Sequence, residues 1–378
     1  MTLMAAMSVD VRADDRALRA GRRQRAREQM VAYDLDVLVL GRQANVRYVS
    51  GAPQLWVAGT RPFGPTCVLV RETGAVHLLS TWDEGVPEDI PHENLYGISW
   101  NPMNAMAALR RIDGASRARR VGTDAMSPAF ARLLPTAFPH AELVDGELAM
   151  RAARRVKTAE EVVSLREALV VAELGLAAAV AELRPGVSEQ LLAGVLLEAL
   201  AAGGVSTPSN QDVAWVTSRE HPWRRVDGDG RVKHGDLVAF SAGVLAGGYI
   251  GEVGRTWPAG AVRGAANLYR RWEVLWSRLL DVCRPGAAAE ELLGAYDAAG
   301  EPAPPMPVAR GLGMGFDPPV VSQHLPRTAA GERLEPGMAL AVTGYVWEPG
   351  VGAVFGREAV LVTADGPEVL TASPSWHA

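Results

Sequence analysis

The chain has 378 residues, a length that favours two domains over one. Hydrophobic residues make up 48% of the sequence and charged residues 21%, a composition typical of globular proteins with sizeable cores. The formal net charge of -5 argues against a general affinity for nucleic acid.

The start of the chain and its apolar runs indicate neither export nor membrane insertion. The first residues lack a basic region ahead of their short apolar part, so we expect no signal peptide. The most apolar run, residues 168–183, contains two glutamates and stops at Pro185, which is typical of a buried helix. Cys67 and Cys283 fall in different predicted domains and suggest no disulfide framework. We therefore expect a cytoplasmic protein with no membrane partner.

The first half of the sequence alternates helical and strand-like segments. Residues 11–33 form a basic amphipathic helix whose arginines we interpret as a solvated face. Residues 35–52 indicate a buried strand, a polar turn and a second short strand, and residues 66–80 indicate a hairpin. The alternation to about residue 150 predicts an α/β layer with a mainly parallel sheet. This half has no Gly-rich phosphate loop, so nucleotide binding has no support.

The second half begins with a strong helix signal and repeats itself. Thr158 and Glu161 form a capping box at the start of a helix that stops at Pro185-Gly186. Further helices are predicted over 188–202, 265–283 and 287–300. Similar Arg-Pro-Gly segments end the first and third of these four helices, and strand-like segments follow each copy. This repeat suggests a pseudo-two-fold domain with a ligand pocket between its halves.

The stretch FSAGVLAGGYIGEVGRT, residues 240–256, predicts a β-hairpin with Gly247-Gly248 at its turn. Glu252 is its single acidic residue, and Ser241 lies at the matching place on the first strand. A lone carboxylate in such a hairpin marks a candidate site.

Several stretches, in order, resemble the pita-bread superfamily of creatinase, aminopeptidase P and prolidase. The superfamily's N-domain signature is similar to NVRYVSGA, and the segment that opens its catalytic domain is similar to RRVKTAEEVVSLREA. Its later motifs are similar to GDLVAFSAGVLAGGYIGEVGRTW, ARGLGMGFDPPV, LEPGMALAVTGYV and FGREAVLVTADGPEVLT. The resemblance implies an α/β (α+β) protein, with a creatinase-like N-terminal domain over 1–150 and a pseudo-two-fold pita-bread domain over 151–378. HPW at 221–223 and TGYVWEPG are most similar to the branch that includes the dimethylsulfoniopropionate lyases.

The resemblance also implies positions for the two divalent metals that the superfamily's peptidases bind through two Asp, one His and two Glu. At those positions this sequence has Ser241, Glu252, Arg310, Thr343 and Arg357, with Glu358 beside the last. A dinuclear centre needs several anionic oxygen ligands, and arginines would repel metal ions at such short range. We therefore expect no metal and no cofactor.

The same positions would form a pocket that binds an anion. Arg310 and Arg357 suit a planar anion, most simply a carboxylate. His221 matches the region where creatinase-type relatives carry a catalytic histidine, and it would move protons with Glu252 or Glu358 as its partner. The remaining substrate-binding residues that we expect in or near this pocket are Asp317, Ser241, Thr343, Trp223 and Arg61. Aromatic residues near the motifs would suit a ring-bearing or otherwise apolar substrate.

Structural interpretations of the same residues stay open. His221, next to Pro222-Trp223, also fits a loop histidine packed on an indole. Arg310 and Glu252 also fit an internal salt bridge that replaces the lost metals. Arg357 and Glu358 are neighbours on one strand and point to opposite faces, so only one of them enters the pocket.

Three functions follow from these observations. The first is a metal-independent, creatinase-type hydrolase or lyase that cleaves a C–N or C–S bond of a small carboxylate-bearing substrate. The second is a catalytically silent pita-bread protein that binds a ligand or partner. The third, a metal-dependent Xaa-Pro dipeptidase, is opposed by the ligand positions. We also expect a homodimer, since superfamily members commonly dimerise, with residues 56–65, including Arg61 and Phe63, reaching the partner's cleft.

Overall fold

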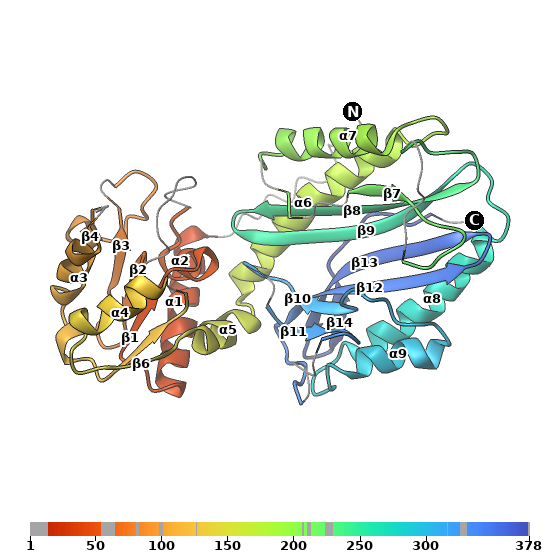
Figure 1. Ribbon diagram of the computed structural model, residues 1–378. Coiled ribbons are helices and arrows are strands. Elements are labelled where there is room, and N and C mark those ends of the chain that lie inside the picture. Colours follow the sequence, from red (N-terminus) through yellow and green to blue (C-terminus); the bar gives the residue numbers. More distant parts are fainter. Residues whose placement is uncertain are drawn as a thin grey trace. The chain divides into compact units, whose positions relative to one another are not determined.

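The computed structural model describes residues 14–53, 65–80, 83–97, 101–125, 127–205, 208–209, 213–223, 230–315, 317–325 and 331–376. Arg61 and Phe63 lie outside the described residues. The chain divides into two compact units, with the boundary between Arg154 and Arg155 (Figure 1).

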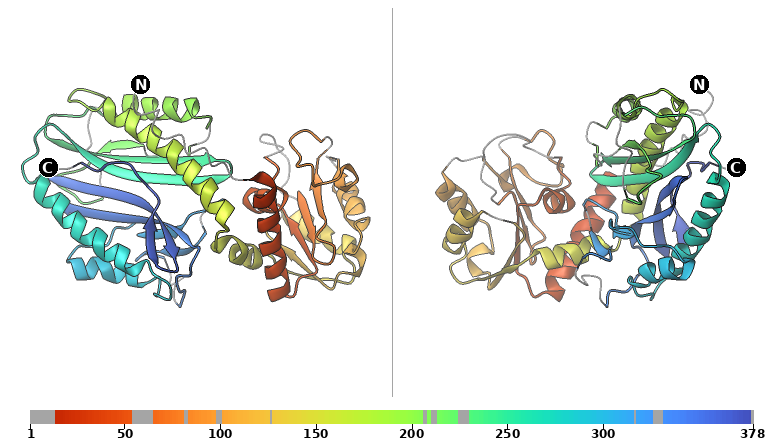
Figure 2. Two further views of the ribbon diagram at one scale, coloured as in Figure 1. Left: turned by 180° about the vertical axis from the view of Figure 1, so that it is seen from behind. Right: turned by 45° about the vertical axis from the view of Figure 1, so that its right-hand side comes forward.

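The first unit is a six-stranded mixed sheet in the order β4-β3-β2-β1-β5-β6. Its strands are β1 (Val37–Leu40), β2 (Cys67–Val70), β3 (Val76–Leu79), β4 (Leu95–Tyr96), β5 (Arg120–Thr123) and β6 (Glu142–Asp145). β1 pairs parallel with β5 and β5 with β6, whereas β2 is antiparallel to both of its neighbours. Its helices are α1 (Asp15–Ala32), α2 (Gln43–Ser50), α3 (Pro102–Arg110), α4 (Pro128–Ala137) and α5 (Glu147–Arg155). Helices α3 and α4 pack on one face of the sheet and α1 on the other (Figure 2).

The segment that the sequence predicts to be a second short strand is helix α2. Its β-branched residues favour a strand, but Asn45, Tyr48 and Val49 lie on one buried side of a helix. The carboxylate of Asp124 accepts hydrogen bonds from the backbone N–H groups of Gly41, at 2.7 Å, and Arg42, at 3.0 Å. Asp124, which is far away in sequence, thus caps the start of α2, where the local sequence offers no capping side chain. This contact outweighs the strand preference of the β-branched residues.

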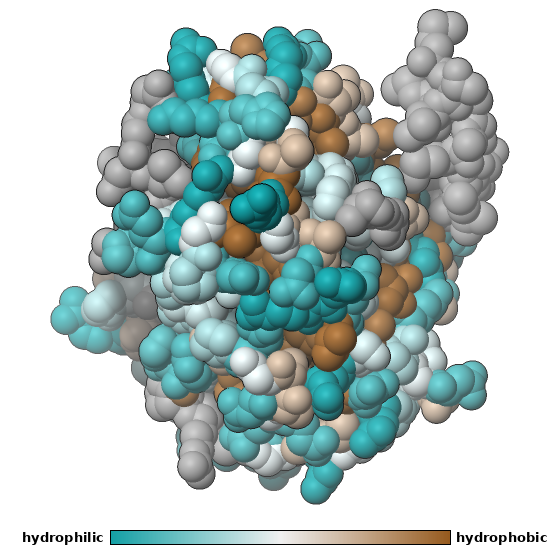
Figure 3. All heavy atoms as spheres, turned by 90° about the vertical axis from the view of Figure 1, so that its right-hand side faces the viewer, coloured by the Kyte–Doolittle hydropathy of each residue, from teal (hydrophilic) through white to brown (hydrophobic). Residues whose placement is uncertain are grey.

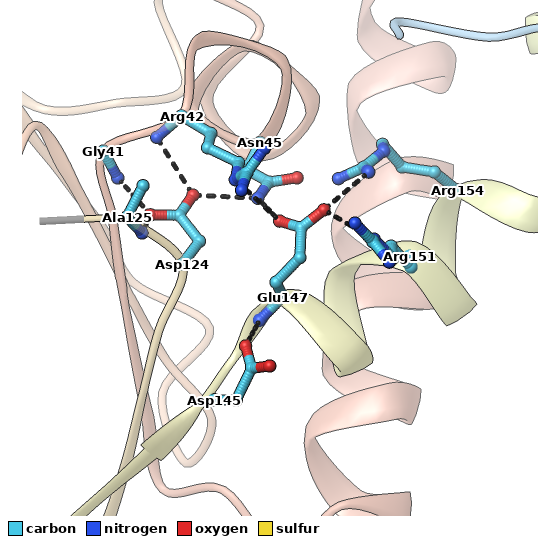
Figure 4. Close-up of polar contacts among 9 residues, drawn as sticks. All are labelled: Gly41, Arg42, Asn45, Asp124, Ala125, Asp145, Glu147, Arg151 and Arg154. Carbon is cyan, nitrogen blue, oxygen red and sulfur yellow. Dashed lines mark hydrogen bonds and ion pairs between the residues drawn. The ribbon is translucent and has the colours of Figure 1, made fainter. Parts of the chain in front are cut away.

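A polar cluster lies at the carboxyl ends of β1, β5 and β6 (Figure 4). Asn45, which is fully buried, donates from its side-chain amide to Asp124 at 2.8 Å and to Glu147 at 2.7 Å. Glu147 is 7% exposed, and its carboxylate lies 3.1 Å from Arg151 and 3.3 Å from Arg154. Burial opposes ionisation of Glu147, but the guanidinium of Arg154 and the amide of Asn45 outweigh it and lower its pKa.

The second unit is an eight-stranded sheet in the order β11-β10-β12-β13-β9-β8-β7, with β14 paired to β13. Its strands are β7 (Ala214–Val216), β8 (Asp236–Ala246), β9 (Tyr249–Ala259), β10 (Ala309–Gly311), β11 (Asp317–Val321), β12 (Ala339–Glu348), β13 (Gly352–Thr363) and β14 (Gly366–Val369). Its helices are α6 (Ala159–Ala181), α7 (Glu189–Ala202), α8 (Ala265–Val282) and α9 (Glu291–Ala299). These four helices agree with the predicted ones, and the capping box of Thr158 and Glu161 is present.

The predicted repeat is visible as two long hairpins, each with a pair of helices. α6 packs on β8 and β9 with α7 beside it, and α8 packs on β12 and β13 with α9 beside it (Figures 1 and 2). β9 joins β13 through the pairing of Gly254 with Arg357, so the two hairpins form one continuous sheet.

Glycines allow the helices to approach this sheet closely. A Cβ atom on Gly251 would lie 2.5 Å from the backbone of Ala168 in α6. The indole of Trp272 in α8 occupies the space above Gly344 and Gly356, and its N–H donates to the carbonyl of Gly344 at 3.1 Å. We call this side of the sheet the helix-covered face and the opposite side the inner face.

Within the described residues, each helix is too short or too polar to span a bilayer. The face of the molecule drawn in Figure 3 has hydrophilic side chains interspersed with hydrophobic ones.

We expect Glu147→Gln to destabilise the first unit by about 3–5 kcal/mol near neutral pH, because the buried Arg154 would lose its ion pair with this carboxylate. The folded pKa of Glu147 is lowered, so its contribution is complete above the ordinary glutamate pKa of about 4.3. It is lost as the pH falls through the lowered value, and the variant should then approach the wild type. Chemical denaturation at several pH values, followed by circular dichroism, measures the difference.

Glu142→Gln is the matched control in the same unit. Glu142 pairs with Arg120 at 2.6 Å, but its side chain is 63% exposed, so the loss should stay within about 1 kcal/mol. Equal losses in the two variants would contradict the structural role given to Glu147.

Candidate active site

The candidate site lies on the inner face, where four strands meet. Ser241 of β8 is opposite Gly254 of β9, Gly254 is opposite Arg357 of β13, and Arg357 is opposite Thr343 of β12. Directly opposed residues of antiparallel strands share a face, so these four form one row. Glu252 precedes Gly254 by two residues and lies on the same face.

Three charged side chains meet beside this row. Arg310 of β10 donates from Nη2 to Oε2 of Glu252, and Nη1 of Arg357 lies 3.7 Å from the same oxygen. Arg357 also donates from Nε to the hydroxyl of Thr343 at 3.1 Å. Glu252 is fully buried, and the side chains of the two arginines are each 14% exposed. We call Arg310, Glu252 and Arg357 the arginine pair site.

Among the described contacts of the arginine pair site, two guanidiniums share the one carboxylate of Glu252. Burial lowers the pKa of Arg357; the carboxylate of Glu252 opposes this effect, and the nearby charge of Arg310 adds to it. A second anion placed against the guanidiniums would relieve their mutual repulsion. The arrangement therefore favours an anionic ligand.

Glu358 lies away from the arginine pair site, on the helix-covered face. Its carboxylate is 2.7 Å from Nη1 of Arg255 and accepts a hydrogen bond from Thr371. Burial raises the pKa of Glu358 despite the charge of Arg255. The expectation that Glu358 serves as a catalytic partner in the pocket is wrong, because successive residues of a strand point to opposite faces.

Asp317 is also apart from the arginine pair site. Its carboxylate is fully buried and lies 3.6 Å from Nζ of Lys157, which precedes α6. The pairing of β10 and β11 is irregular between Arg310 and Gly311, and Asp317 is opposite Gly311. Asp317 shares the face of Gly311, and Arg310, the preceding residue of β10, points to the opposite face, so the expected place of Asp317 beside the arginines is wrong.

His221 and Trp223 lie on a segment that crosses to the inner face. The ring of Trp223 packs on Tyr345, with 4.4 Å between ring centroids, and its backbone N–H donates to the Tyr345 hydroxyl at 3.4 Å. His221 is exposed, and its backbone N–H donates to the hydroxyl of Ser218 at 3.2 Å. The described contacts do not connect His221 with Glu252.

A group of aromatic side chains adjoins the arginine pair site, and we call it the aromatic wall: Trp215, Trp223, Tyr345, Trp347 and Phe355. Tyr345 and Phe355 are not among the residues predicted from the sequence. Tyr345 and Phe355 are opposite each other, one inner-face row beyond Thr343 and Arg357. The guanidinium carbon of Arg357 lies 5.3 Å from the centre of the Phe355 ring. The signal for these residues is the alternation in TGYVW and AVFGR, which becomes informative once the register of the hairpin is known.

Two domain families match the sequence. Residues 163–364 match metallopeptidase family M24, and residues 22–156 match the creatinase/prolidase N-terminal domain. The chain belongs to family M24.

Individual relatives agree with this assignment. The alignment with the creatinase of Bacillus sp. (strain B-0618) is 388 positions long and 24% identical, and it covers 93% of this chain and 90% of that protein. The Xaa-Pro dipeptidase of Pyrococcus furiosus is 26% identical over 226 residues, which cover 58% and 63% of the two chains. The prolidase structure from Pyrococcus horikoshii OT3 superposes with a TM-score of 0.75 at 20% identity, covering 94% of this chain and 99% of that one. These matches confirm the creatinase- and prolidase-like pita-bread fold.

The M24 name implies divalent metal ions, and the residues of this chain do not fit them. Of the five matching positions, only Glu252 offers a carboxylate, and two guanidiniums already surround it. In the described part of the chain, no group of three or more His, Cys, Asp or Glu side chains is arranged to hold a metal ion. The donor chemistry at this site is that of an anion site, not of a dication site.

We expect Glu252→Gln to lower the free energy of unfolding by about 3–5 kcal/mol, because two largely buried guanidiniums would lose the carboxylate that they share. Thermal and urea unfolding measure the loss. The matched control is Glu348→Gln, whose carboxylate pairs with Arg271 at 3.2 Å and is 36% exposed. The control should change stability by less than about 1 kcal/mol. A Glu252 variant as stable as the control would show that the arginines do not depend on this carboxylate.

Proposed function

We propose that this chain is a metal-independent, creatinase-like hydrolase or lyase that cleaves a C–N or C–S bond of a small carboxylate-bearing substrate. The observation that carries the proposal is the arginine pair site, in which Arg310 and Arg357 converge on the inner face. Guanidiniums bind a carboxylate through paired hydrogen bonds, which fix its orientation as well as its position.

His221 is the proposed proton-transfer residue. Its segment is attached to the inner face at two points, because Trp347 donates from its indole N–H to the carbonyl of Ser218 at 2.8 Å and Trp223 packs on Tyr345. His221 lies between these attachments, so its segment follows the aromatic wall. Histidine is suited to give and take a proton near neutral pH.

The relatives agree with creatinase-like chemistry but do not separate it from peptide hydrolysis, because the Bacillus protein named creatinase aligns with 93% of this chain and the prolidase structure from Pyrococcus horikoshii OT3 covers 94% of it. The preference for a metal-independent reaction comes from the arginines, which oppose a metal-dependent peptidase at two of the expected ligand positions. We further propose a small anionic substrate and a homodimer, as expected from the sequence.

A catalytically silent protein that binds a carboxylate is the second candidate. His221 is exposed, and the described contacts do not pair it with a carboxylate. Glu252 is engaged by two arginines, and the described contacts do not bring it to His221. Both observations fit a binding site without chemistry.

We expect His221→Ala to abolish turnover in a screen of amino acids, N-substituted amino acids and sulfonium acids, with an unchanged melting temperature. The matched control is His324→Ala, which alters another exposed histidine and should leave turnover unchanged. Activity retained by the His221 variant would contradict its proposed role. Calorimetric binding of acids without turnover by the wild type would favour the silent protein.

We expect protein purified without chelator to contain manganese, zinc and iron well below one equivalent per chain. The reason is the donor set, in which only Glu252 is a carboxylate. Elemental analysis by plasma mass spectrometry measures the content, and the melting temperature should not respond to EDTA. One or two tightly held metal ions per chain would refute metal independence.

A further inference from the structure

The segment that follows β14, residues 371–376, bridges the two halves of the second unit, and we call it the strap. Near its start, Oε1 of Glu173 in α6 accepts hydrogen bonds from the backbone N–H of Ser373, at 2.5 Å, and from its hydroxyl, at 2.8 Å. At its end, Trp376 packs on Tyr269 of α8 with 4.6 Å between ring centroids. Because α6 packs on β8 and β9 and α8 packs on β12 and β13, the strap fastens one half of the sheet to the other.

The strap also contacts the buried ion pair behind the arginine pair site. Arg255 donates from Nη2 to the carbonyl of Ser373 at 3.1 Å, and Glu358 accepts a hydrogen bond from the hydroxyl of Thr371. The side chains of Arg255 and Glu358 lie 2.7 Å apart, and both residues are almost fully buried. Nη1 of Arg255 also donates to the backbone carbonyl of Arg357 at 3.3 Å. One guanidinium therefore connects the strap to the backbone of Arg357.

The junction of β9 with β13 depends on side chains. Its described register pairs Gly254 with Arg357, whereas β8 and β9 pair along their whole length. Beside that pair, the hydroxyl of Thr256 donates to the carbonyl of Phe355 and accepts from its backbone N–H, both at 2.9 Å. Tyr269, on which the strap ends, donates to the carbonyl of Thr256 at 2.5 Å. Side-chain hydrogen bonds thus satisfy backbone groups that a longer ladder would pair, and the strap contacts the residues that supply them.

We propose that the strap is a brace for the anion site, and that Glu173 and Arg255 are positioning residues that act through Arg357. The strap holds the junction of β9 with β13 closed from the helix-covered face. A closed junction keeps the guanidinium of Arg357 beside Glu252 on the inner face, where a carboxylate would bind. Release of the strap loosens the junction and weakens anion binding. This inference rests on the proposed function, since it concerns the same anion site and adds the residues that position it.

Two variants release the strap at its two attachments. Glu173→Met removes the oxygen that accepts the strap's hydrogen bonds, and Trp376→Ala removes the packing on Tyr269. Glu173→Gln keeps an acceptor oxygen at the same place and should stay close to the wild type. The matched control is Glu167→Met, which alters an exposed glutamate of the same helix. Melting temperatures verify that each variant folds, and Trp376→Ala carries the test if Glu173→Met does not fold.

Hydrogen exchange and acetate binding give separate measurements of the junction and of the anion site. We expect the backbone N–H of Phe355, which donates to Thr256, to exchange roughly tenfold faster or more in both release variants. Calorimetric titration with acetate, the simplest carboxylate probe, should show an affinity that is roughly tenfold lower than in the wild type. The control should match the wild type in both measurements. A role in stability alone would lower the melting temperature and leave the acetate affinity of the folded protein unchanged.

The outcomes distinguish this inference from the proposed function. Unchanged exchange of the Phe355 amide in the release variants would refute the brace and leave the proposed function standing. Faster exchange with an unchanged affinity for acetate would refute the positioning role of Glu173 and Arg255. If the wild type does not bind acetate, the anion site of the proposed function is refuted, and the positioning role falls with it whatever the exchange rates show.

Discussion

The second unit depends on one constraint, which is that the buried carboxylate of Glu252 must be paired. A fully buried charge without a partner costs several kcal/mol, so the strands around it have to deliver cations at hydrogen-bonding range. Arg310 comes from β10 and Arg357 from β13, and neither neighbours β9 in sequence. The pairing therefore couples the register of both halves of the sheet, and it brings two guanidiniums to one carboxylate where the halves meet. The proposed preference for an anionic ligand rests on the same contact.

The two faces of the sheet contribute differently to the contact of Glu252 with the two arginines. On the helix-covered face, Gly251 admits α6, and Gly344 and Gly356 admit the indole of Trp272. On the same face Arg255 pairs with Glu358 and donates to the backbone carbonyl of Arg357 at 3.3 Å. Arg357 is thus supported from behind by a buried ion pair that a ligand does not touch. The inner face keeps the polar groups that remain for recognition.

Sequence predicted the parts of this protein that depend on local signals. The capping box at Thr158, the helix ends before Pro-Gly and the hairpin around Gly247-Gly248 each need only a few neighbouring residues. Helix α2 was predicted wrongly because its cap, Asp124, is remote in the chain. Asp317 was misplaced because its pairing with Gly311, and hence the face that it occupies, is not visible in the sequence. Tyr345 and Phe355 were missed because their proximity to the arginines exists only across paired strands.

The exchange of metal ligands for arginines changes what chemistry the M24 scaffold is able to support. A metal ion polarises a bond and activates water at the same place, whereas a guanidinium only binds and orients. Glu252 is engaged by both arginines, and for this reason the proposed mechanism assigns proton transfer to His221. The segment of His221 is fastened to Trp347 and Tyr345, the same aromatic wall that would receive the apolar part of a ligand. Under the proposed function, ligand binding and the placement of His221 are therefore linked through one surface, because a ligand that contacts Trp223 would lie close to His221 in the chain.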